Sequence, residues 1–413
     1  MTSRRDYKSA DMEILLISHK YPPATGGMEK QSFELITGLG KLTKVHAIVY
    51  TPEESRITFF LLLEKRIKRM LNTYPGISIV HFNDGLIAAY SLLHRSYKHL
   101  IRSVTLHGLD VVFPSMIFQK MIIPKFNNFD QIFAVSGATA NACSNRGISK
   151  DKIAVVNNGV DVSPRVPTTR PEVERMLSLK YGVEVVDKKI LIAIGRPVKR
   201  KGFSWFIRNV LPGLDVDVIL LLVGPVQTTR SFSSRFIEFL PGSVRDRIEL
   251  FLGAASDERE LRQLLEYPNQ NPRVARMGKL PLEEMNGILS VADAFIMPNI
   301  EVSGDMEGFG LVCLEACMQG ANVFAAASGG ITDAIIPGKN GHLLPSGQAE
   351  VWSETLTLAL SQKQHNTAHA EEIIDFTKNH FSWEKMCSAY LQHFIRLHNS
   401  RMAKRSERTI PQA

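Results

Sequence analysis

The sequence has little cysteine and no long hydrophobic run. Its 413 residues include four cysteines, Cys143, Cys313, Cys317 and Cys387, and no CxxC pair. This is too few for a disulfide scaffold, and in a helical pattern Cys313 and Cys317 favour a pair of core thiols over a metal site. We therefore expect a reducing, cytoplasmic compartment. No segment approaches the roughly 20 apolar residues that cross a bilayer, which excludes an integral membrane protein.

The sequence also lacks a strong charge of one sign. Lysine and arginine total 49 and aspartate and glutamate 41, a net charge of +8, and 44% of the residues are hydrophobic. This is an ordinary globular composition, and the length predicts two or three domains. The mild positive excess permits an anionic ligand or an anionic membrane surface without requiring either, and we expect no nucleic-acid partner. The short apolar stretch near residue 15 is interpreted as a first strand and not as a signal peptide.

Short apolar runs alternate with helical patterns along the whole chain. The expected strands are 13–18, 45–50, 77–82, 102–106, 131–135 and 153–156, then 189–194, 217–223, 247–252, 294–297, 322–325 and 342–344. The expected helices are 29–39, 56–71, 86–94 and 138–145, then 283–290, 311–318 and 350–360. This alternation predicts an α/β fold with parallel sheets covered on both faces. The polar stretch 162–174, with three prolines, is interpreted as a linker between two doubly wound domains, 1–165 and 175–380, facing each other across a cleft.

A run of cations follows the strand expected at 189–194. After Gly195, the residues Arg196, Lys199, Arg200 and Lys201 fall within six positions. Ligands of open α/β sheets bind outside the carboxyl ends of the strands, and arginine with lysine suits a diphosphate. A solvated basic loop without a ligand is the alternative, and these residues alone do not decide between the two.

Two carboxylates flank an expected helix start at Gly310. Gly308 and Gly310 allow close approach of the backbone to a ligand, and the free N–H groups of a helix start favour phosphate. Glu307 precedes the helix, while Glu315 lies about one and a half turns inside it, at an apolar position where an unpaired carboxylate is costly. We interpret the pair as holding hydroxyls at the two ends of an elongated ligand. An acidic N-cap with a buried structural glutamate is the alternative.

Two loops of the first half are candidates for the same cleft. Gly26 and Gly27 open a helix after the first strand, and His107 ends the strand 102–106. A histidine there can bond a substrate hydroxyl or polarise a leaving group. A plain strand–helix connection and a structural histidine are the alternatives.

These motifs together resemble a known family. GR-x4-KG at 195–202, EGFGL-x3-EA at 307–316, the glycine pair after the first strand and FAVSGATANACSNRGISKDKIAVVNNGVD at 133–161 are similar to the retaining glycosyltransferases of the bacterial group 1 type, family 4. The resemblance covers about residues 12–397. The chain departs from the family pattern at Asn299, where serine is usual, and in the long loop 299–306.

The resemblance implies the GT-B architecture of two Rossmann-like domains, with a nucleotide-sugar donor held mainly by the second. It implies that Arg196 and Lys201 bind the diphosphate, that Glu315 binds the ribose and that Glu307 binds the transferred sugar. The full implied set is His107, Arg196, Lys201 and Glu307 for catalysis, and Gly26, Gly27, Gly195, Arg196, Lys201, Glu307, Gly308, Phe309, Gly310, Leu311 and Glu315 for donor binding. It implies no divalent metal and no cofactor. It also implies a helix at 381–397 that packs back on the first domain; the basic stretch after it, within 396–413, is expected to fray.

We therefore expect a retaining enzyme that moves a hexose-type sugar from a nucleoside diphosphate to a saccharide or lipid-linked acceptor, in cell-surface polysaccharide or glycolipid synthesis. The expected route is front-face attack assisted by the leaving phosphate. An epimerase or phosphorylase of the same fold, or a non-catalytic sugar-nucleotide-binding subunit, is the alternative.

Two segments of the first half combine apolar and cationic residues. In 56–71, one side is expected to carry Ile57, Phe60, Leu61, Glu64, Ile67 and Leu71, with cations over much of the rest, and 111–126 is a second apolar stretch with two lysines. An apolar face edged by cations fits an anionic membrane interface. A helix packed on its own sheet with solvated cations is the alternative. Peripheral attachment to the inner face of the cell membrane is therefore left open.

Overall fold

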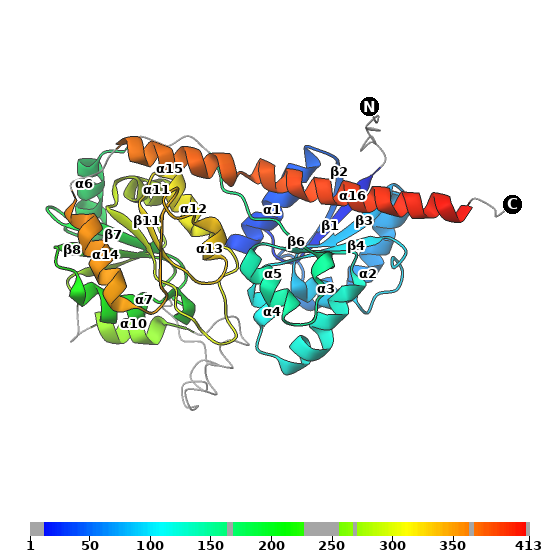
Figure 1. The fold of residues 1–413 in the computed structure, drawn as a ribbon, viewed down its shortest axis with the longest axis horizontal. Coiled ribbons are helices and arrows are strands. Elements are labelled where there is room, and N and C mark those ends of the chain that lie inside the picture. The colour runs from blue at the N-terminus through cyan, green and yellow to red at the C-terminus, as the bar shows by residue number, and fades with distance from the viewer. Residues whose placement is uncertain (1–11, 163–167, 227–255, 267–270, 363–366, 410–413) are drawn as a thin grey trace. The chain divides into compact units, whose positions relative to one another are not determined.

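The computed structural model describes residues 12–162, 168–226, 256–266, 271–362 and 367–409, and it contains two six-stranded sheets (Figure 1). The chain divides into two compact units. Unit 1 comprises Met1–Val111, Met116–Gly159 and Ser382–Ala413, and unit 2 comprises Val112–Ser115 and Val160–Phe381. The strand at 247–252 and the centre of the linker, 163–167, lie outside the described residues.

The sheet of unit 1 has the order β2-β1-β3-β4-β5-β6, with every neighbouring pair parallel. The strands are β1 Glu13–Ser18, β2 Lys44–Val49, β3 Ile77–Phe82, β4 Ile101–Leu106, β5 Gln131–Ala134 and β6 Ile153–Val155. The helices are α1 Gly27–Gly40, α2 Arg56–Thr73, α3 Gly85–Ser91, α4 Leu109–Val112, η2 Phe118–Ile122, η3 Ile123–Asn128, α5 Gly137–Ser144, η4 Lys150–Lys152 and α16 Trp383–Thr409. The order in which the chain adds strands to this sheet changes direction between β1 and β3. Ligands of such sheets bind at this topological switch point.

Helix α2 differs in orientation from the sequence-based expectation. Its fully buried residues are Phe59, Leu63 and Ile67, which pack in the apolar cluster of unit 1, while Ile57 and Leu61 are exposed. The expected side spans an arc of about 120°, but the buried side is rotated from it by about 100°, so that only Ile67 belongs to both, because apolar residues occur on both arcs of this helix. The helix begins at a serine N-cap, with the Ser55 hydroxyl accepting from the Thr58 N–H at 3.0 Å.

The last helix, α16, belongs to unit 1 and contacts α1 and β3. Gly38 of α1 lies against Cys387 of α16, and a side chain at position 38 would collide with the thiol. The expectation of a frayed stretch from residue 396 onward is wrong as far as Thr409, because the helix runs to that residue. The reason lies in its tertiary contacts: His398 Nδ1 is 3.1 Å from Ser78 Oγ, and Arg401 pairs with Asp130 at 3.5 Å.

The sheet of unit 2 has the order β12-β11-β10-β7-β8-β9 and is also parallel. The strands are β7 Lys189–Ile194, β8 Val218–Val223, β9 Val274–Gly278, β10 Ala294–Met297, β11 Val323–Ala326 and β12 His342–Leu344. The helices are α6 Arg170–Tyr181, η5 Lys199–Lys201, α7 Phe203–Trp205, η6 Phe206–Val210, η7 Leu211–Gly213, α10 Glu258–Leu265, α11 Leu282–Val291, α12 Leu311–Met318, α13 Ile331–Ala334, α14 Ala349–Ser361 and α15 Thr367–His380. In this sheet the order in which the chain adds strands changes direction between β7 and β10.

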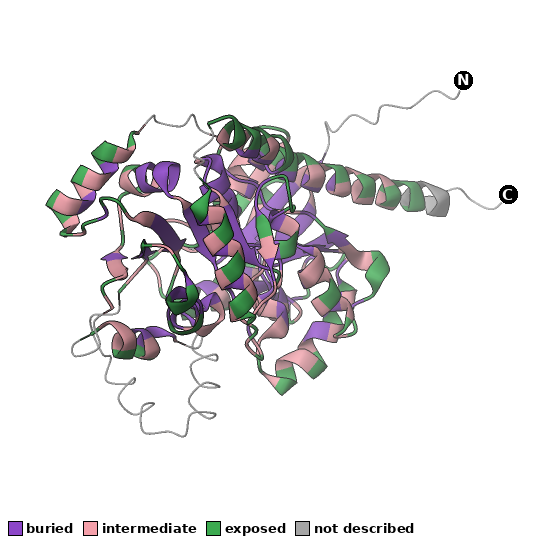
Figure 2. Ribbon diagram, turned by 60° about the vertical axis from the view of Figure 1, so that its left-hand side comes forward, coloured by how far each residue is buried: buried purple, intermediate pink, exposed green. Residues whose placement is uncertain are grey.

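Side chains of unit 2 alternate strictly between two apolar cores. Along β7, Ile190 and Ile192 pack with α6, α11, α12 and α15, whereas Leu191 and Ala193 pack with α7, η6, α10 and α14. This period of two is the signature of a strand covered on both faces. Figure 2 shows the strands buried and the outer helix surfaces exposed. The predicted doubly wound α/β class is confirmed for both sheets.

Strand β9 and helix α6 are among the elements of unit 2 that were not expected from the sequence. Strand β9 has only one fully buried residue, Met277, so it carries no continuous apolar run. Helix α6 begins at Arg170, inside the stretch interpreted as a linker. Its start is a capping box in which the Thr169 N–H donates to Glu172 Oε2 at 2.8 Å, with a proline in the first turn. Proline and threonine here open a helix and do not mark a linker.

Candidate active site

The loops after β7 and β10 meet at the point where the sheet of unit 2 changes direction. The loop after β7 contains Gly195 to Gly202, and the loop after β10 runs from Pro298 to Gly310. The two strands are hydrogen-bonded neighbours, so the two loops emerge side by side at the same carboxyl edge. The Ile300 N–H donates to the Arg200 carbonyl at 2.9 Å and joins them directly.

Lys201 and Glu307 form the centre of this edge. Lys201 Nζ lies 2.9 Å from Glu307 Oε2, and Lys201 is only 7% exposed. Two further groups reach the same oxygen: Arg200 Nε at 3.3 Å and Asn299 Nδ2 at 3.4 Å. Burial raises the pKa of Glu307, but the charges of Lys201 and Arg200 outweigh it and lower the pKa to about 2. Glu307 is therefore ionised at any physiological pH.

The two oxygens of Glu307 have different surroundings. Oε2 is approached by three donors, whereas Oε1 accepts no hydrogen bond from the residues that the structure describes. A carboxylate held through one oxygen keeps its orientation and can accept a hydroxyl hydrogen bond through the other. This geometry fits the predicted role of Glu307 toward a sugar hydroxyl.

Arg200 and Asp305 form an ion pair that the sequence analysis did not single out. Arg200 Nη1 lies 3.3 Å from Asp305 Oδ2, and both side chains are largely buried. Burial raises the pKa of Asp305 despite the nearby guanidinium. Asp305 Oδ1 and Asn299 Oδ1 are buried without a hydrogen-bond partner among the described residues. The signal was visible in the sequence as Arg200 in the cation run and as the long loop 299–306, whose folding back on Arg200 no spacing rule predicts.

Two glycine positions make this arrangement possible. Gly202 has φ 66°, and a Cβ there would collide with the Pro298 carbonyl oxygen. Gly330 donates its N–H to the Glu307 carbonyl at 2.8 Å, and a Cβ there would collide with the Gly308 carbonyl oxygen. Three loops, after β7, β10 and β11, are thus packed backbone to backbone around Glu307.

Helix α10 supports the basic loop from outside the site. The Asp257 N–H donates to the Pro197 carbonyl at 2.9 Å, and its carboxylate accepts from the Ser204 hydroxyl at 2.5 Å and from the Ser204 N–H at 3.0 Å. Val198 also forms an isolated bridge with Ser256. Apart from the strand expected at 247–252, no element was predicted within 226–272, so this support was missed.

The remaining predicted donor-binding residues are placed as follows. Arg196 is exposed, and its side chain makes no hydrogen bond or ion pair with the described part of the chain. Gly195 lies beside the Lys201 side chain, Gly310 is the N-cap of α12 with φ 93°, and Leu311 is its first residue. Phe309 is buried against Phe381, with ring centroids 6.2 Å apart, so only its backbone remains for a ligand.

Glu315 departs from the expectation of a buried carboxylate. It is half-buried, while its neighbours Cys313, Leu314, Ala316 and Cys317 are buried. The apolar sequence around it predicted burial, but α12 is only eight residues long and leaves one edge partly open. Burial cost is therefore no argument for a ligand at Glu315.

The predicted residues of unit 1 follow β1 and β4, at the carboxyl edge of its sheet, on either side of β3. Gly26 is the N-cap of α1 and Gly27 its first residue. His107 follows β4 and is nearly buried; its Nε2 donates to the Asn83 carbonyl at 2.9 Å, and its N–H donates to Asp110 Oδ1 at 2.8 Å. The hydrogen on Nε2 leaves Nδ1 of the neutral ring as an acceptor.

A histidine–aspartate pair beside them was missed. His19 Nδ1 lies 2.7 Å from Asp84 Oδ2, and Asp84 Oδ1 caps α3 by accepting from Leu86 and Ile87 at 2.9 Å each. Burial raises the pKa of Asp84, but His19 and the capping bonds outweigh it, so the pKa lies below its usual range. The two residues are 65 positions apart, and their only sequence signal is that each follows a strand.

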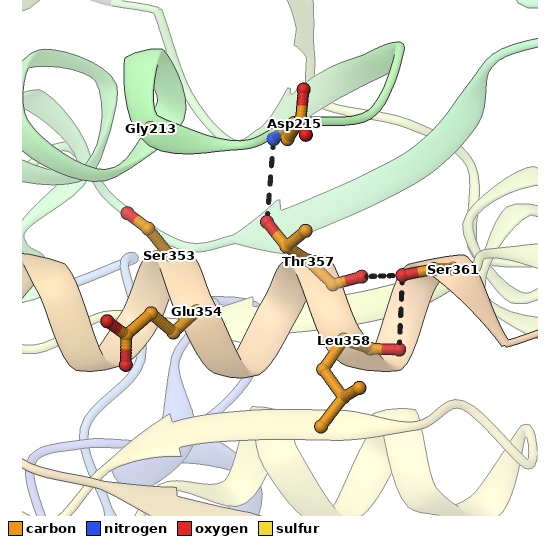
Figure 3. Close-up of a pocket in the computed structure, with 7 residues that line it drawn as sticks. All are labelled: Gly213, Asp215, Ser353, Glu354, Thr357, Leu358 and Ser361. Carbon is orange, nitrogen blue, oxygen red and sulfur yellow. Dashed lines mark hydrogen bonds between the residues drawn. The ribbon is translucent and has the colours of Figure 1, made fainter.

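A separate hollow of about 430 Å³ lies elsewhere in unit 2 (Figure 3). It is lined by Gly213, Asp215, Ser353, Glu354, Thr357, Leu358 and Ser361, from the segment before β8 and one face of α14. These residues lie at the amino end of β8, the edge opposite the Lys201–Glu307 pair. Within the described residues, no group of three or more His, Cys, Asp or Glu side chains is arranged to hold a metal ion, and no helix is long and apolar enough to cross a membrane.

Two family models match the chain in succession. Residues 8–164 match the model described as glycosyltransferase family 4, and residues 180–379 match the one described as glycosyl transferases group 1. Together they leave only residues 165–179 and the two ends unmatched. The chain belongs to the group 1 glycosyltransferases. The predicted family is thereby confirmed.

Relatives of this glycosyltransferase are named for colanic acid biosynthesis and for mannose transfer to a phosphatidylinositol mannoside. It is 27% identical over 258 residues to the candidate colanic acid biosynthesis glycosyltransferase WcaL of Salmonella typhimurium, covering 57% of this chain and 61% of that one. It is 26% identical over 361 residues to a GDP-mannose-dependent alpha-(1-6)-phosphatidylinositol monomannoside mannosyltransferase of Mycolicibacterium smegmatis, covering 79% and 84%. The match thus covers about three fifths of the length of WcaL.

Solved structures confirm the GT-B fold of this glycosyltransferase. The HepE protein of Anabaena in complex with UDP matches with a TM-score of 0.66 at 17% identity, over 93% of this chain and 100% of that one. Sucrose-phosphate synthase of Thermosynechococcus elongatus matches with a TM-score of 0.67 at 22% identity, over 94% and 100%. At these identities the likeness concerns the fold alone.

Proposed function

We propose that this glycosyltransferase moves a hexose-type sugar from a nucleoside diphosphate to a saccharide or lipid-linked acceptor, with retention at the anomeric carbon. The observation that carries the proposal is Glu307, held by Lys201, Arg200 and Asn299 through one oxygen and accepting no hydrogen bond from the described residues at the other. Beside it are the exposed cation Arg196 and the start of α12. An anion-binding helix start, cations and an oriented carboxylate are the groups that a sugar diphosphate requires.

The residues of unit 2 act on the charge that develops as the sugar–phosphate bond breaks. Lys201 has three N–H donors, so it can keep its bond to Glu307 and still donate to a phosphate oxygen. Arg196 and the N–H groups at Gly310 and Leu311 add fixed positive potential at the leaving diphosphate. In the proposed front-face route the acceptor oxygen bonds to the anomeric carbon, the carbon–oxygen bond to phosphate breaks, and the acceptor proton passes to that phosphate oxygen. We propose that this route needs no divalent metal.

The names of the relatives support a role in cell-surface polysaccharide or glycolipid synthesis. One is named for colanic acid biosynthesis, and another for mannose transfer to a phosphatidylinositol mannoside. The HepE structure holds UDP, a starch synthase structure of Arabidopsis thaliana holds ADP, and the mannosyltransferase is named for GDP-mannose, so all three bases enter the test. A nucleotide-sugar epimerase or phosphorylase of the same fold is separated from a transferase by whether nucleotide release depends on an acceptor.

The test is thermal unfolding with UDP-, GDP- and ADP-sugars, followed by calorimetry with the bare nucleotide, both in EDTA. One class of donor should stabilise the enzyme by about 2.7 kcal/mol at a hundredfold excess over its Kd. Glu315→Gln should weaken binding of the bare nucleotide, whereas Glu307→Gln should spare it and lower turnover. Equal losses of nucleotide affinity in both variants, or no stabilising nucleotide sugar, would contradict the proposal.

A further inference from the structure

Helix α2 exposes aliphatic side chains to solvent on the side opposite its core. Ile57 is 73% exposed, Leu61 70% and Leu62 39%, while Phe59, Leu63 and Ile67 fill the core of unit 1. Single exposed aliphatic residues are normal on a soluble surface, but three within two turns of one helix are a cluster. They lie on the side of the helix opposite the core, so something outside unit 1 must cover them if they are to leave water.

Exposed cations continue the same face toward the end of the helix. Lys65, Lys68 and Arg69 are exposed, and at 100° per residue they fall with Ile57, Leu61 and Leu62 within an arc of about 140°. We call these six residues the α2 outer face.

The acidic groups near the α2 outer face are engaged elsewhere. The two carboxylate oxygens of Glu54 accept hydrogen bonds from Arg66 Nη1 and Nη2, at 2.6 Å each. Glu64, the single carboxylate within α2, accepts from the Arg95 and Ser96 N–H groups at 2.7 and 3.0 Å. The charge of Lys65, Lys68 and Arg69 is therefore not neutralised within the helix.

A second helical segment of unit 1 repeats this composition. Met116, Ile117 and Met121 are exposed, and exposed Lys120 lies among them. Helix α3 contacts α2 and also contacts η3, which directly follows this segment. Helices α2, α3 and η3 therefore belong to one layer on the first sheet. Both α2 and the segment before η3 expose methionine or aliphatic side chains beside cations.

We propose that the α2 outer face binds the surface of a bilayer that contains anionic lipid. The lysines argue against a protein partner, because lysine is depleted in protein interfaces, whereas it is favoured where phosphate headgroups meet an apolar layer. Ile57, Leu61 and Leu62 enter the boundary between headgroups and acyl chains, and Lys65, Lys68 and Arg69 contact lipid phosphates. This deepens the proposed function, because a lipid-linked acceptor is met at such a surface.

The experiment is sedimentation of the full chain with phosphatidylcholine vesicles, with and without phosphatidylglycerol, at low and high salt. We expect binding to the anionic vesicles at low salt and weak binding to the neutral ones. The triple variant Lys65→Gln, Lys68→Gln, Arg69→Gln should weaken partitioning about a hundredfold, since each cation near the surface contributes about fivefold. The triple variant Ile57→Ser, Leu61→Ser, Leu62→Ser should weaken it at every salt concentration.

The matched control is Leu179→Ser with Leu358→Ser, two isolated exposed leucines of unit 2 that are 76% and 65% exposed. It should bind vesicles as the unchanged protein does. The proposal is wrong if the protein stays in the supernatant with anionic vesicles at low salt. It is also wrong if the control loses as much binding, or if sedimentation velocity reveals a dimer that the aliphatic variant dissolves. Nucleotide binding measured in the same variants separates this result from a failure of the proposed function.

Discussion

The two sheets carry opposite chemistry at their direction changes. In unit 2 the groups are ionic: Lys201 and Arg200 converge on Glu307, and Arg200 also pairs with Asp305. Unit 1 also has a charged carboxylate at its edge, Asp84 beside His19, but the side chains beneath it that face α16 are neutral and joined by hydrogen bonds. His81 Nδ1 lies 2.9 Å from Ser103 Oγ, and Asn83 Nδ2 donates to Ser32 Oγ at 2.7 Å.

The neutral network of unit 1 extends to the last helix. Thr105 Oγ1 lies 3.1 Å from His81 Nε2 and 2.8 Å from the Tyr390 hydroxyl of α16. The face of the first sheet that α16 covers thus carries hydrogen-bonded polar side chains, whereas both faces of the second sheet carry an apolar core. The comparison teaches that unit 2 is built to meet a developing charge, whereas unit 1 fixes hydrogen-bond directions and docks α16.

The largest expected effect is on the ionic side. Lys201→Met keeps the aliphatic stem but removes the charge, and we expect kcat/KM to fall by a factor that corresponds to roughly 2–4 kcal/mol of transition-state stabilisation. Part of the loss arises because Glu307 is left without its closest cation. Steady-state kinetics measures it, with the exposed Arg196→Met as the comparison, for which a smaller loss is expected. If kcat/KM of the folded Lys201→Met enzyme were unchanged, Lys201 would not belong to the site.

A smaller effect is expected from Arg200, which acts through Glu307 and Asp305. Arg200→Gln should lower kcat/KM about tenfold, equal to roughly 1.4 kcal/mol, because the carboxylate loses one of the donors that orient it. The pKa of Glu307 should rise, since Arg200 is one of the charges that depress it. The acid limb of the pH–rate profile should therefore move to higher pH, and Arg200→Lys should restore part of the original profile. An unshifted acid limb would show that Arg200 only supports the loop.

The sequence predicts the features that depend on neighbouring residues better than those that depend on contacts between residues far apart in the chain. The predicted strands of unit 2 coincide with β7, β8, β10, β11 and β12 to within one residue, because buried runs of valine, isoleucine and leucine are a local signal. Strand β9 and the Asp257 support were missed, since neither has such a run. Lys201 and Glu307 were assigned through the family motifs, and the structure brings them together.

The remaining site contacts depend on tertiary folding. Asp305 and Arg200 are 105 positions apart, and His19 and Asp84 are 65 apart, so no local pattern predicts either pair. Glu315 shows the reverse error, because an apolar neighbourhood in sequence did not imply burial in space. Residue type and motif therefore predicted which side chains matter, but not which partners orient them.

The smallest expected effect concerns the neutral side and is a dependence of stability on pH. Burial lowers the pKa of His81 from its usual 6.5 to about 3. Below pH 6.5 the unfolded chain therefore binds a proton at this residue that the folded protein does not, and stability falls by about 1.4 kcal/mol for each pH unit until pH 3. Above pH 6.5 the contribution is constant. Urea unfolding at pH 7.5 and pH 5.5 should show a loss of stability in acid.

The variant His81→Gln isolates this contribution, because it keeps a hydrogen-bonding side chain that does not titrate. Whatever its stability at pH 7.5, its loss between the two pH values should be about 1 kcal/mol smaller than that of the unchanged protein. The matched control in unit 2 is His342→Gln, because this imidazole is exposed and water can solvate its charged form, so a smaller difference is expected. If both variants changed the pH dependence of stability equally, burial of His81 in the neutral network of unit 1 would not favour the uncharged imidazole more than the surroundings of His342 in unit 2 do.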